Sequence, residues 1–220
     1  MPNYSQGARN SCGAWCAAHR IGIRNRPQIL ASDKNFINAG EAVWGLVKFQ
    51  STSRPTTLPL SPPPNAGDKM FTDWCANSYS DPWKIAWHLR STGVNSELYI
   101  STMAPAGVMN PPAGAFSRLQ IMRWLLENLQ SRRGLALTQG DLTATPIGGY
   151  AICICREGAL ALHYVLFRRR STGWQVYDPR SSQLNWRSIG APPTFLGTFQ
   201  TTLPGERRGN YTFLGVFIRC

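Results

Sequence analysis

The chain has 220 residues, of which 43% are hydrophobic and eight are tryptophan, so it can bury a core without disulfide or metal staples. No apolar run reaches the roughly 18 residues of a membrane span, and the polar N-terminus lacks the apolar core of a cleaved signal peptide. The formal net charge is +12, but the basic residues are scattered and no nucleic-acid-binding motif accompanies them. The charge therefore favours an acidic protein partner or a nucleic-acid-associated target, and an ordinary solvated surface is an equal alternative.

Helical patterns dominate the first two thirds of the chain. Asn10 or Ser11 can cap a helix that begins at Cys12, because short polar side chains accept hydrogen bonds from the first turn. The clearest apolar periodicity ends at Gly134, which is a typical helix stop. The predicted helices are 12–23, 35–49, 81–93 and 113–134, and the proline-rich segment 51–66 is predicted to be an exposed loop.

Strand patterns dominate from residue 147 onward. The segments are short, β-branched and aromatic, and Gly, Pro and Ser separate them. The predicted antiparallel strands lie within 148–155, 159–169, 173–179, 194–203 and 211–220. Helices first and strands second predict an α+β protein with two lobes, a helical one over about 1–140 and a β lobe over about 147–220.

Six cysteines are present, and no C-x-x-C pair occurs among them. Cys153 and Cys155 alternate along a predicted strand and share one of its faces. We expect both to be buried core thiols, because no second Cys/His pair stands at the spacing of a zinc site.

Cys12 is the candidate nucleophile. It lies at the start of the first helix, where unpaired backbone N–H groups and the positive end of the helix dipole favour a thiolate. Cys16 lies one turn further along, where this effect has faded.

His163 is the candidate base. His19 lies two turns along the same helix as Cys12, about 10 Å away at 1.5 Å per residue. His88 lies next to Trp83 and Trp87 on a predicted helix, which favours packing. His163 instead lies on a predicted strand that is followed by a turn and by a second strand ending at Asp178.

The turn of this hairpin decides whether His163 and Asp178 meet. A two-residue turn at 171–172 pairs His163 with Arg180 and makes Asp178 its diagonal neighbour on the same face, about 7–8 Å away at the backbone. A turn at 172–173 also keeps the two residues on one face, whereas a three-residue loop separates them. In the favourable registers, Asp178 can orient the imidazole and stabilise its charged form.

These residues resemble the site of the papain-like cysteine peptidases. Gln6 precedes Cys12 by six positions, Gly13 and Ala14 follow it, and His163 and Asp178 come about 150 residues later. The chain order Cys, His, Asp and the compact N-terminal pattern are most similar to the bacterial double-glycine peptidases and papain-like effector proteases.

The resemblance implies a role for each of these residues and a fold for the chain. Cys12 would be the nucleophile, His163 the base, Asp178 the residue that orients it and Gln6 the oxyanion-hole donor. The fold implied is a single papain-like catalytic domain over 1–220, with the cysteine helix in the helical lobe and His and Asp in the β lobe. Neither a cofactor nor a metal is expected.

The function implied is a cysteine protease that cleaves a protein substrate, as a bacterial toxin or effector domain. Such a protein would be cytoplasmic in its producer, or delivered into a target cell without a cleaved signal peptide, and an acidic inhibitor or immunity protein is a candidate partner. A glutamine deamidase, transglutaminase or amidase with the same triad, and an inactive binding module, are the alternatives, because one fold hosts many functions.

Overall fold

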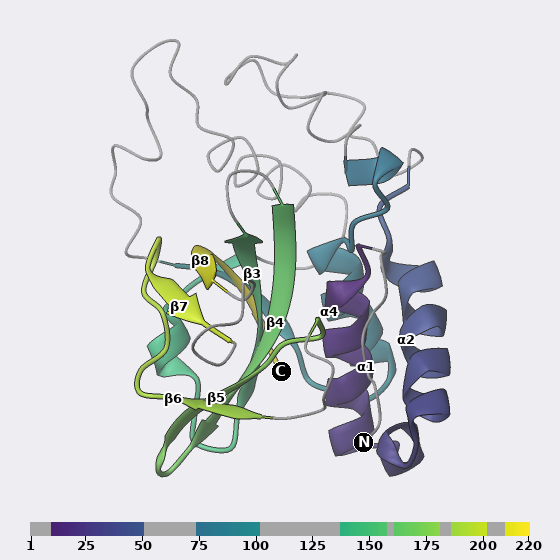
Figure 1. Ribbon diagram of the computed structural model, residues 1–220, viewed down its shortest axis with the longest axis horizontal. Coiled ribbons are helices and arrows are strands. Elements are labelled where there is room, and N and C mark those ends of the chain that lie inside the picture. The colour runs from purple at the N-terminus through teal and green to yellow at the C-terminus, as the bar shows by residue number, and fades with distance from the viewer. Residues whose placement is uncertain (1–9, 51–73, 102–136, 158–160, 181–185, 202–209) are drawn as a thin grey trace.

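The computed structural model describes residues 10–50, 74–101, 137–157, 161–180, 186–201 and 210–220 (Figure 1). Its helices are α1 (Cys12–Arg24), α2 (Asp33–Val47) and α4 (Pro82–Ser91), with short 3-10 helices at Pro27–Leu30 and Leu142–Ala144. Its strands are β1 (Glu97–Ile100), β2 (Leu137–Gln139), β3 (Tyr150–Glu157), β4 (Ala161–Arg170), β5 (Gly173–Tyr177), β6 (Arg187–Ile189), β7 (Thr198–Gln200) and β8 (Asn210–Arg219).

Three of the four predicted helices fall on described residues, and all three are present. Ser32 caps α2 by accepting a hydrogen bond from the backbone N–H of Asn35, and Asp81 caps α4 through the N–H groups of Trp83 and Lys84. Ser11 is the residue before α1, but its side chain makes no capping bond. The prediction that a side chain caps α1 is therefore not met by Ser11, whose hydroxyl oxygen is buried without a partner among the described residues.

The strands predicted from residue 147 onward pair antiparallel with one another, as expected, and two further strands make the whole sheet mixed. Its order is β2-β1-β8-β3-β4-β5-β6, with β7 also paired to β8. β1 and β2 are parallel to each other, and every other pairing of the described strands is antiparallel. Both β1 and β2 come from within 1–140, so helices and strands are interleaved along the chain instead of following one another.

Two apolar layers lie on the two faces of this sheet. Alternation along β3 sends Ile152 and Ile154 into a core shared with the helices, and Cys153 and Cys155 into a second core on the other face. Both thiols are fully buried, which confirms the prediction made for them.

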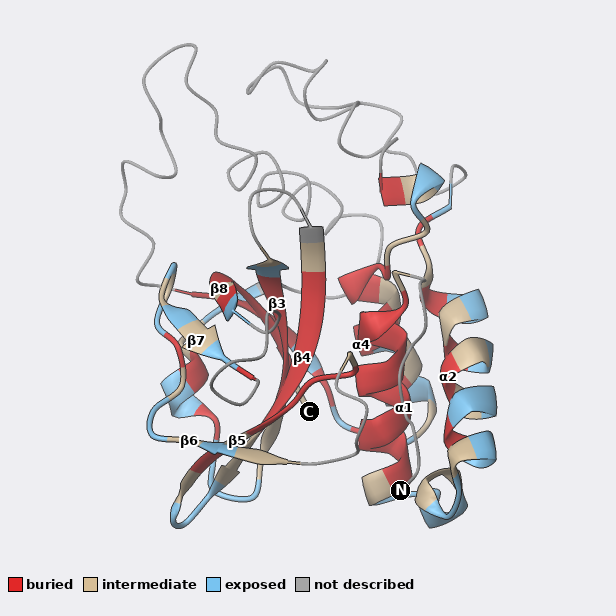
Figure 2. Cartoon of the chain, in the orientation of Figure 1, coloured by how far each residue is buried: buried red, intermediate tan, exposed pale blue. Residues whose placement is uncertain are grey.

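Helix α1 is enclosed by the other elements, whereas α2 forms the outer edge of the helical part. Figure 2 shows α1 buried over most of its length, from Cys12 to Gly22, and α2 buried on one side only. The buried stripe of α2 consists of Phe36, Gly40, Val43 and Val47, at helical spacing. The buried start of α1 places Cys12 inside the molecule, close to the sheet.

Some predictions lie outside the described residues. These are the loop 51–66, the helix 113–134 and the oxyanion donor Gln6. In the described part of the chain, no helix is both long and apolar enough to cross a membrane.

Candidate active site

Cys12 is the first residue of α1 and is only 1% exposed. The first hydrogen bond within the helix runs from the N–H of Trp15 to the carbonyl of Ser11. The backbone N–H groups of the three residues before Trp15, which are Cys12 to Ala14, have no acceptor within the helix. They are therefore available to a negative charge at this end of α1.

Gly13 allows the start of α1 to pack closely on the neighbouring chain. A Cβ atom at this position would lie 2.7 Å from Cδ1 of Ile85 on α4 and 2.8 Å from Cβ of Ser80. The residue after the candidate nucleophile is therefore glycine because the helix start has no room for a side chain.

His163 and Asp178 meet, as the register expected from a two-residue turn predicts. Arg170 pairs with Gly173 across a two-residue turn at 171–172, and the register runs on to Leu166 and Tyr177. Nε2 of His163 lies 2.8 Å from Oδ1 of Asp178, and the two side chains are 0% and 4% exposed. The structure thus brings together the predicted base and its orienting carboxylate.

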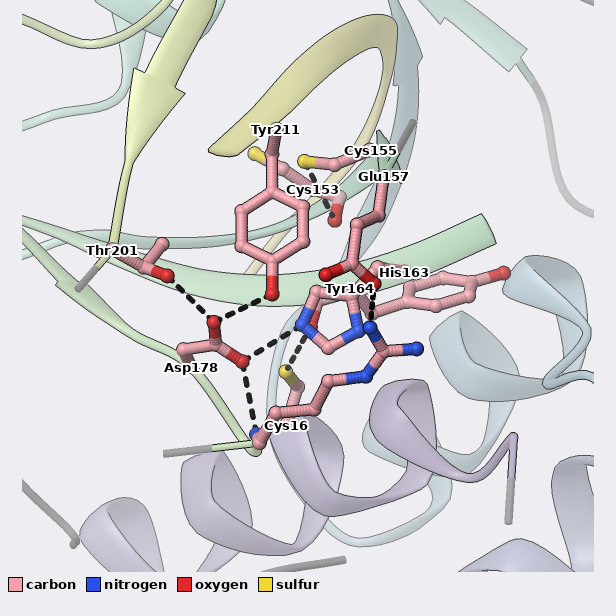
Figure 3. Close-up of polar contacts among 10 residues, drawn as sticks. Cys16, Cys153, Cys155, Glu157, His163, Tyr164, Asp178, Thr201 and Tyr211 are labelled. Carbon is pink, nitrogen blue, oxygen red and sulfur yellow. Dashed lines mark hydrogen bonds and ion pairs between the residues drawn. The ribbon is translucent and has the colours of Figure 1, made fainter. Parts of the chain in front are cut away.

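Four hydrogen bonds hold the Asp178 carboxylate. Oδ1 accepts from His163 and, at 2.9 Å, from the backbone N–H of Arg180. Oδ2 accepts from the hydroxyls of Thr201 at 2.6 Å and Tyr211 at 2.9 Å. Figure 3 shows one carboxylate oxygen facing Thr201 and Tyr211 while the other faces the imidazole. Charge and donors together make this a well-satisfied buried anion.

The electrostatics of the pair follow from these contacts. Burial alone would raise the pKa of Asp178, but the His163 charge and the hydrogen bonds from His163, Thr201 and Arg180 hold it below its usual range. Burial alone would lower the pKa of His163, but Asp178 and then Cys12 outweigh burial and raise it. The environment therefore favours a carboxylate beside an imidazolium.

Nδ1 of His163 is the ring nitrogen that remains for Cys12. Nε2 is committed to Asp178, and Nδ1 is buried and makes no conventional hydrogen bond among the described residues. Cys12 is among the groups that raise the pKa of His163, after Asp178, so the thiol lies near the ring although no hydrogen bond joins Nδ1 to a described residue. A loose thiol–imidazole contact is common in the absence of substrate and tightens when substrate binds.

The other cysteine and the other histidines of this region are packed differently. Cys16 is fully buried, its thiol faces the carbonyl of Tyr164 at 3.6 Å, and burial raises its pKa well above the ordinary value. His19 stacks on Tyr177 with ring centroids 4.4 Å apart, and burial followed by the charge of Arg168 lowers its pKa to about 3. Both environments disfavour the charged forms that nucleophilic catalysis needs.

His88 is also a poor candidate for the base. It lies in the last turn of α4, where burial and then the charge of Arg26 lower its pKa. No contact of His88 with a thiol is present among the described residues.

Sequence reasoning missed the groups that surround the pair. Thr201 follows β7 and Tyr211 lies on β8, so both reach Asp178 from chain segments far along the sequence. Tyr79 is a further neighbour: burial, and then the Cys12 charge, raise its pKa. Arg180 forms an ion pair with Glu157 at the edge of the site, where each side chain is about a quarter exposed. None of these residues belongs to a local sequence pattern that could have indicated its role.

No cluster of His, Cys, Asp and Glu within the described ranges is arranged to hold a metal ion. The chemistry that the arrangement offers is acid–base and nucleophilic, from one thiol, one imidazole and one carboxylate. Comparison with protein-family models, with curated proteins and with solved structures found no match for this chain.

Proposed function

We propose that the protein is a cysteine peptidase in which Cys12 attacks a peptide carbonyl, His163 transfers the proton and Asp178 orients His163. The observation that carries this proposal is the His163 ring. One of its nitrogens bonds a buried carboxylate, while the other is left for a thiol at a helix start. Nucleophile, base and orienting group in this order are the recurring arrangement of covalent acyl transfer.

The chemistry runs in two steps. In the first, the Cys12 thiolate attacks the carbonyl carbon and the imidazolium of His163 protonates the leaving amine, which leaves a thioester on Cys12. In the second, neutral His163 takes a proton from water, the resulting hydroxide attacks the thioester, and the acid product leaves as the Cys12 thiolate and the His163 imidazolium are restored. Asp178 keeps its charge throughout and stabilises the imidazolium.

The start of α1 supplies donors for the tetrahedral oxyanion. The N–H of Cys12 belongs to the turn without intrahelical acceptors, and such preorganised donors typically lower the barrier by about 3–4 kcal/mol each. Gln6 remains the proposed second donor on the strength of the motif alone, because it lies outside the described residues.

An epoxide thiol trap tests the nucleophile directly. We expect the wild type to be labelled at Cys12 and the Cys12→Ala protein to lose that label, while Cys16→Ala keeps it. Mapping of new protein N-termini in cells that express wild type or Cys12→Ala then identifies cleaved bonds. Equal sets of new N-termini in the two cell populations would exclude a peptidase that depends on Cys12.

The same samples separate the alternatives. A deamidase changes the intact mass of its target by replacing NH with O and leaves the chain uncut, and a transglutaminase joins two molecules. A binding module leaves Cys12 unlabelled by the trap. The peptidase proposal predicts fragments, and any of these other results would replace it.

A further inference from the structure

Tyr211 makes two different contacts with the candidate catalytic pair. Its ring stacks on the imidazole of His163, with centroids 4.7 Å apart and planes inclined by 20°. Its hydroxyl donates to Oδ2 of Asp178 at 2.9 Å. Both contacts come from one side chain that is 1% exposed and belongs to a central strand of the sheet (Figure 3).

We infer that Tyr211 is a positioning residue of the candidate active site, which sets the plane of the His163 ring and the orientation of the Asp178 carboxylate; this rests on the proposed function. Thr201 shares the second task. Both residues bond the Asp178 oxygen that does not contact His163.

The stacking contact restricts the plane of the imidazole ring. A single hydrogen bond from Nε2 to Oδ1 still allows the imidazole plane to tilt through small rotations about the side-chain bonds of His163, and such a tilt would displace Nδ1. A parallel aromatic surface at stacking distance opposes this rotation. Holding reacting groups in one geometry removes an entropic cost from the reaction, and small misplacements lose large factors in rate.

The hydrogen bonds to Oδ2 restrict the orientation of the Asp178 carboxylate. Each of its oxygens can accept two hydrogen bonds, and Thr201 and Tyr211 occupy Oδ2. Only Oδ1 is then presented to the ring, and the backbone N–H of Arg180 fills its second position. The carboxylate cannot turn without breaking these bonds, so the direction of the bond to His163 is determined by chain segments outside the hairpin.

The hydroxyl of Tyr211 is suited to donate. Burial, followed by the charge of Asp178 and its hydrogen bond, raises the pKa of Tyr211 above the ordinary value of a phenol. The side chain therefore stays protonated over the pH range in which the pair works, and its proton points to Oδ2.

The test follows the rate at which iodoacetamide alkylates Cys12, by peptide mapping, across buffers from mildly acidic to mildly alkaline. Mapping separates Cys12 from the partly exposed Cys75 and Cys220. We expect Tyr211→Leu to slow this reaction about tenfold near neutral pH, the scale of one hydrogen bond to a charged group. Its pH profile should become that of an unpaired thiol.

Three variants show whether the effect belongs to the site. Tyr211→Phe keeps the ring and loses only the hydroxyl, so its rate should lie between wild type and Tyr211→Leu. Phe217→Leu is the matched control, because Phe217 is an equally buried aromatic residue of β8 that stacks on Tyr99 instead. Its loss should lower thermal stability and leave the alkylation profile of the folded protein unchanged. His163→Ala removes the base and sets the lower limit of the rate.

The outcomes distinguish failure of the positioning role from failure of the proposed function. If Tyr211→Leu and His163→Ala both lose the fast reaction while Phe217→Leu keeps it, the positioning role is supported. If only His163→Ala loses it, or if Phe217→Leu loses as much as Tyr211→Leu, the positioning role is wrong and the proposed function stands. If His163→Ala reacts like wild type, Cys12 has no imidazole partner and both proposals fail.

Discussion

Two helical glycines offer a sharp test of how tightly the start of α1 is packed. Gly13 follows Cys12 on α1, and a Cβ atom there would lie 2.7 Å from Cδ1 of Ile85 and 2.8 Å from Cβ of Ser80. Gly45 lies on the exposed side of α2, and a Cβ atom there would meet nothing within 4 Å. The same substitution to alanine should therefore have opposite effects at the two positions.

The magnitudes follow from packing and helix propensity. Overpacking a buried position costs about 1–3 kcal/mol. Replacing an interior helical glycine by alanine gains about 0.5–1 kcal/mol where space is free. Gly13→Ala should thus lower the free energy of unfolding by roughly 1–2 kcal/mol. Gly45→Ala should raise the free energy of unfolding by roughly 0.5–1 kcal/mol.

Thermal unfolding measures both effects, since a chain of this size shifts its midpoint by about 2–4 °C per kcal/mol. Gly13→Ala should also slow the alkylation of Cys12 in the folded protein, because the clash displaces the helix start, whereas Gly45→Ala should not. A Gly13→Ala protein that is as stable as Gly45→Ala, with an unchanged Cys12 reaction, would refute the close packing of α1 on Ser80 and Ile85.

Further predictions concern the candidate triad. Cys12→Ala should abolish turnover, whereas Cys16→Ala should only lower stability through lost packing, as unfolding and peptide cleavage assays would reveal. His163→Ala should be as inactive as Cys12→Ala, because the effects of residues that act as a unit are not additive. Asp178→Ala should retain more activity, and His88→Ala should retain nearly all of it. An inactive His88→Ala together with an active His163→Ala would mean that His88 is the base. The lowered pKa of Asp178 gives stability that is present above its unfolded value of about 4 and lost as the pH falls, and the raised pKa of His163 gives stability that is present below about 6.5 and lost as the pH rises. Urea unfolding should therefore show the largest stability difference between wild type and Asp178→Asn between these two values, and a difference that does not vary with pH would contradict the ion pair.

The hairpin that carries His163 and Asp178 could be predicted because its information is local. A two-residue turn and the two-residue period of strands determine which side chains share a face, and the observed pairing of Arg170 with Gly173 agrees with this arithmetic. The helices could be predicted for the same reason, since the polar residues Ser32 and Asp81 stand directly before α2 and α4.

Strand neighbours across the sheet could not be predicted in this way. β1 is only four residues long, follows α4 directly, and becomes a strand because it pairs with β8 and β2. Its partners lie on segments far along the chain, so no window around Glu97–Ile100 contains the information. The interleaving of helices and strands, and with it the mixed sheet, follows from these long-range pairings.

The candidate site likewise combines residues brought together by local pairing with residues brought together by long-range strand pairing. Asp178 is 15 residues from His163 and within one hairpin, whereas Tyr211 is 33 residues from Asp178 and reaches it only because β8 lies beside β3. Local pairing brings the carboxylate to the imidazole, but a buried carboxylate needs further donors to offset the loss of water. Those donors must come from whatever strands the sheet places there, so the residues that complete the site are determined by topology and become visible only in the folded chain.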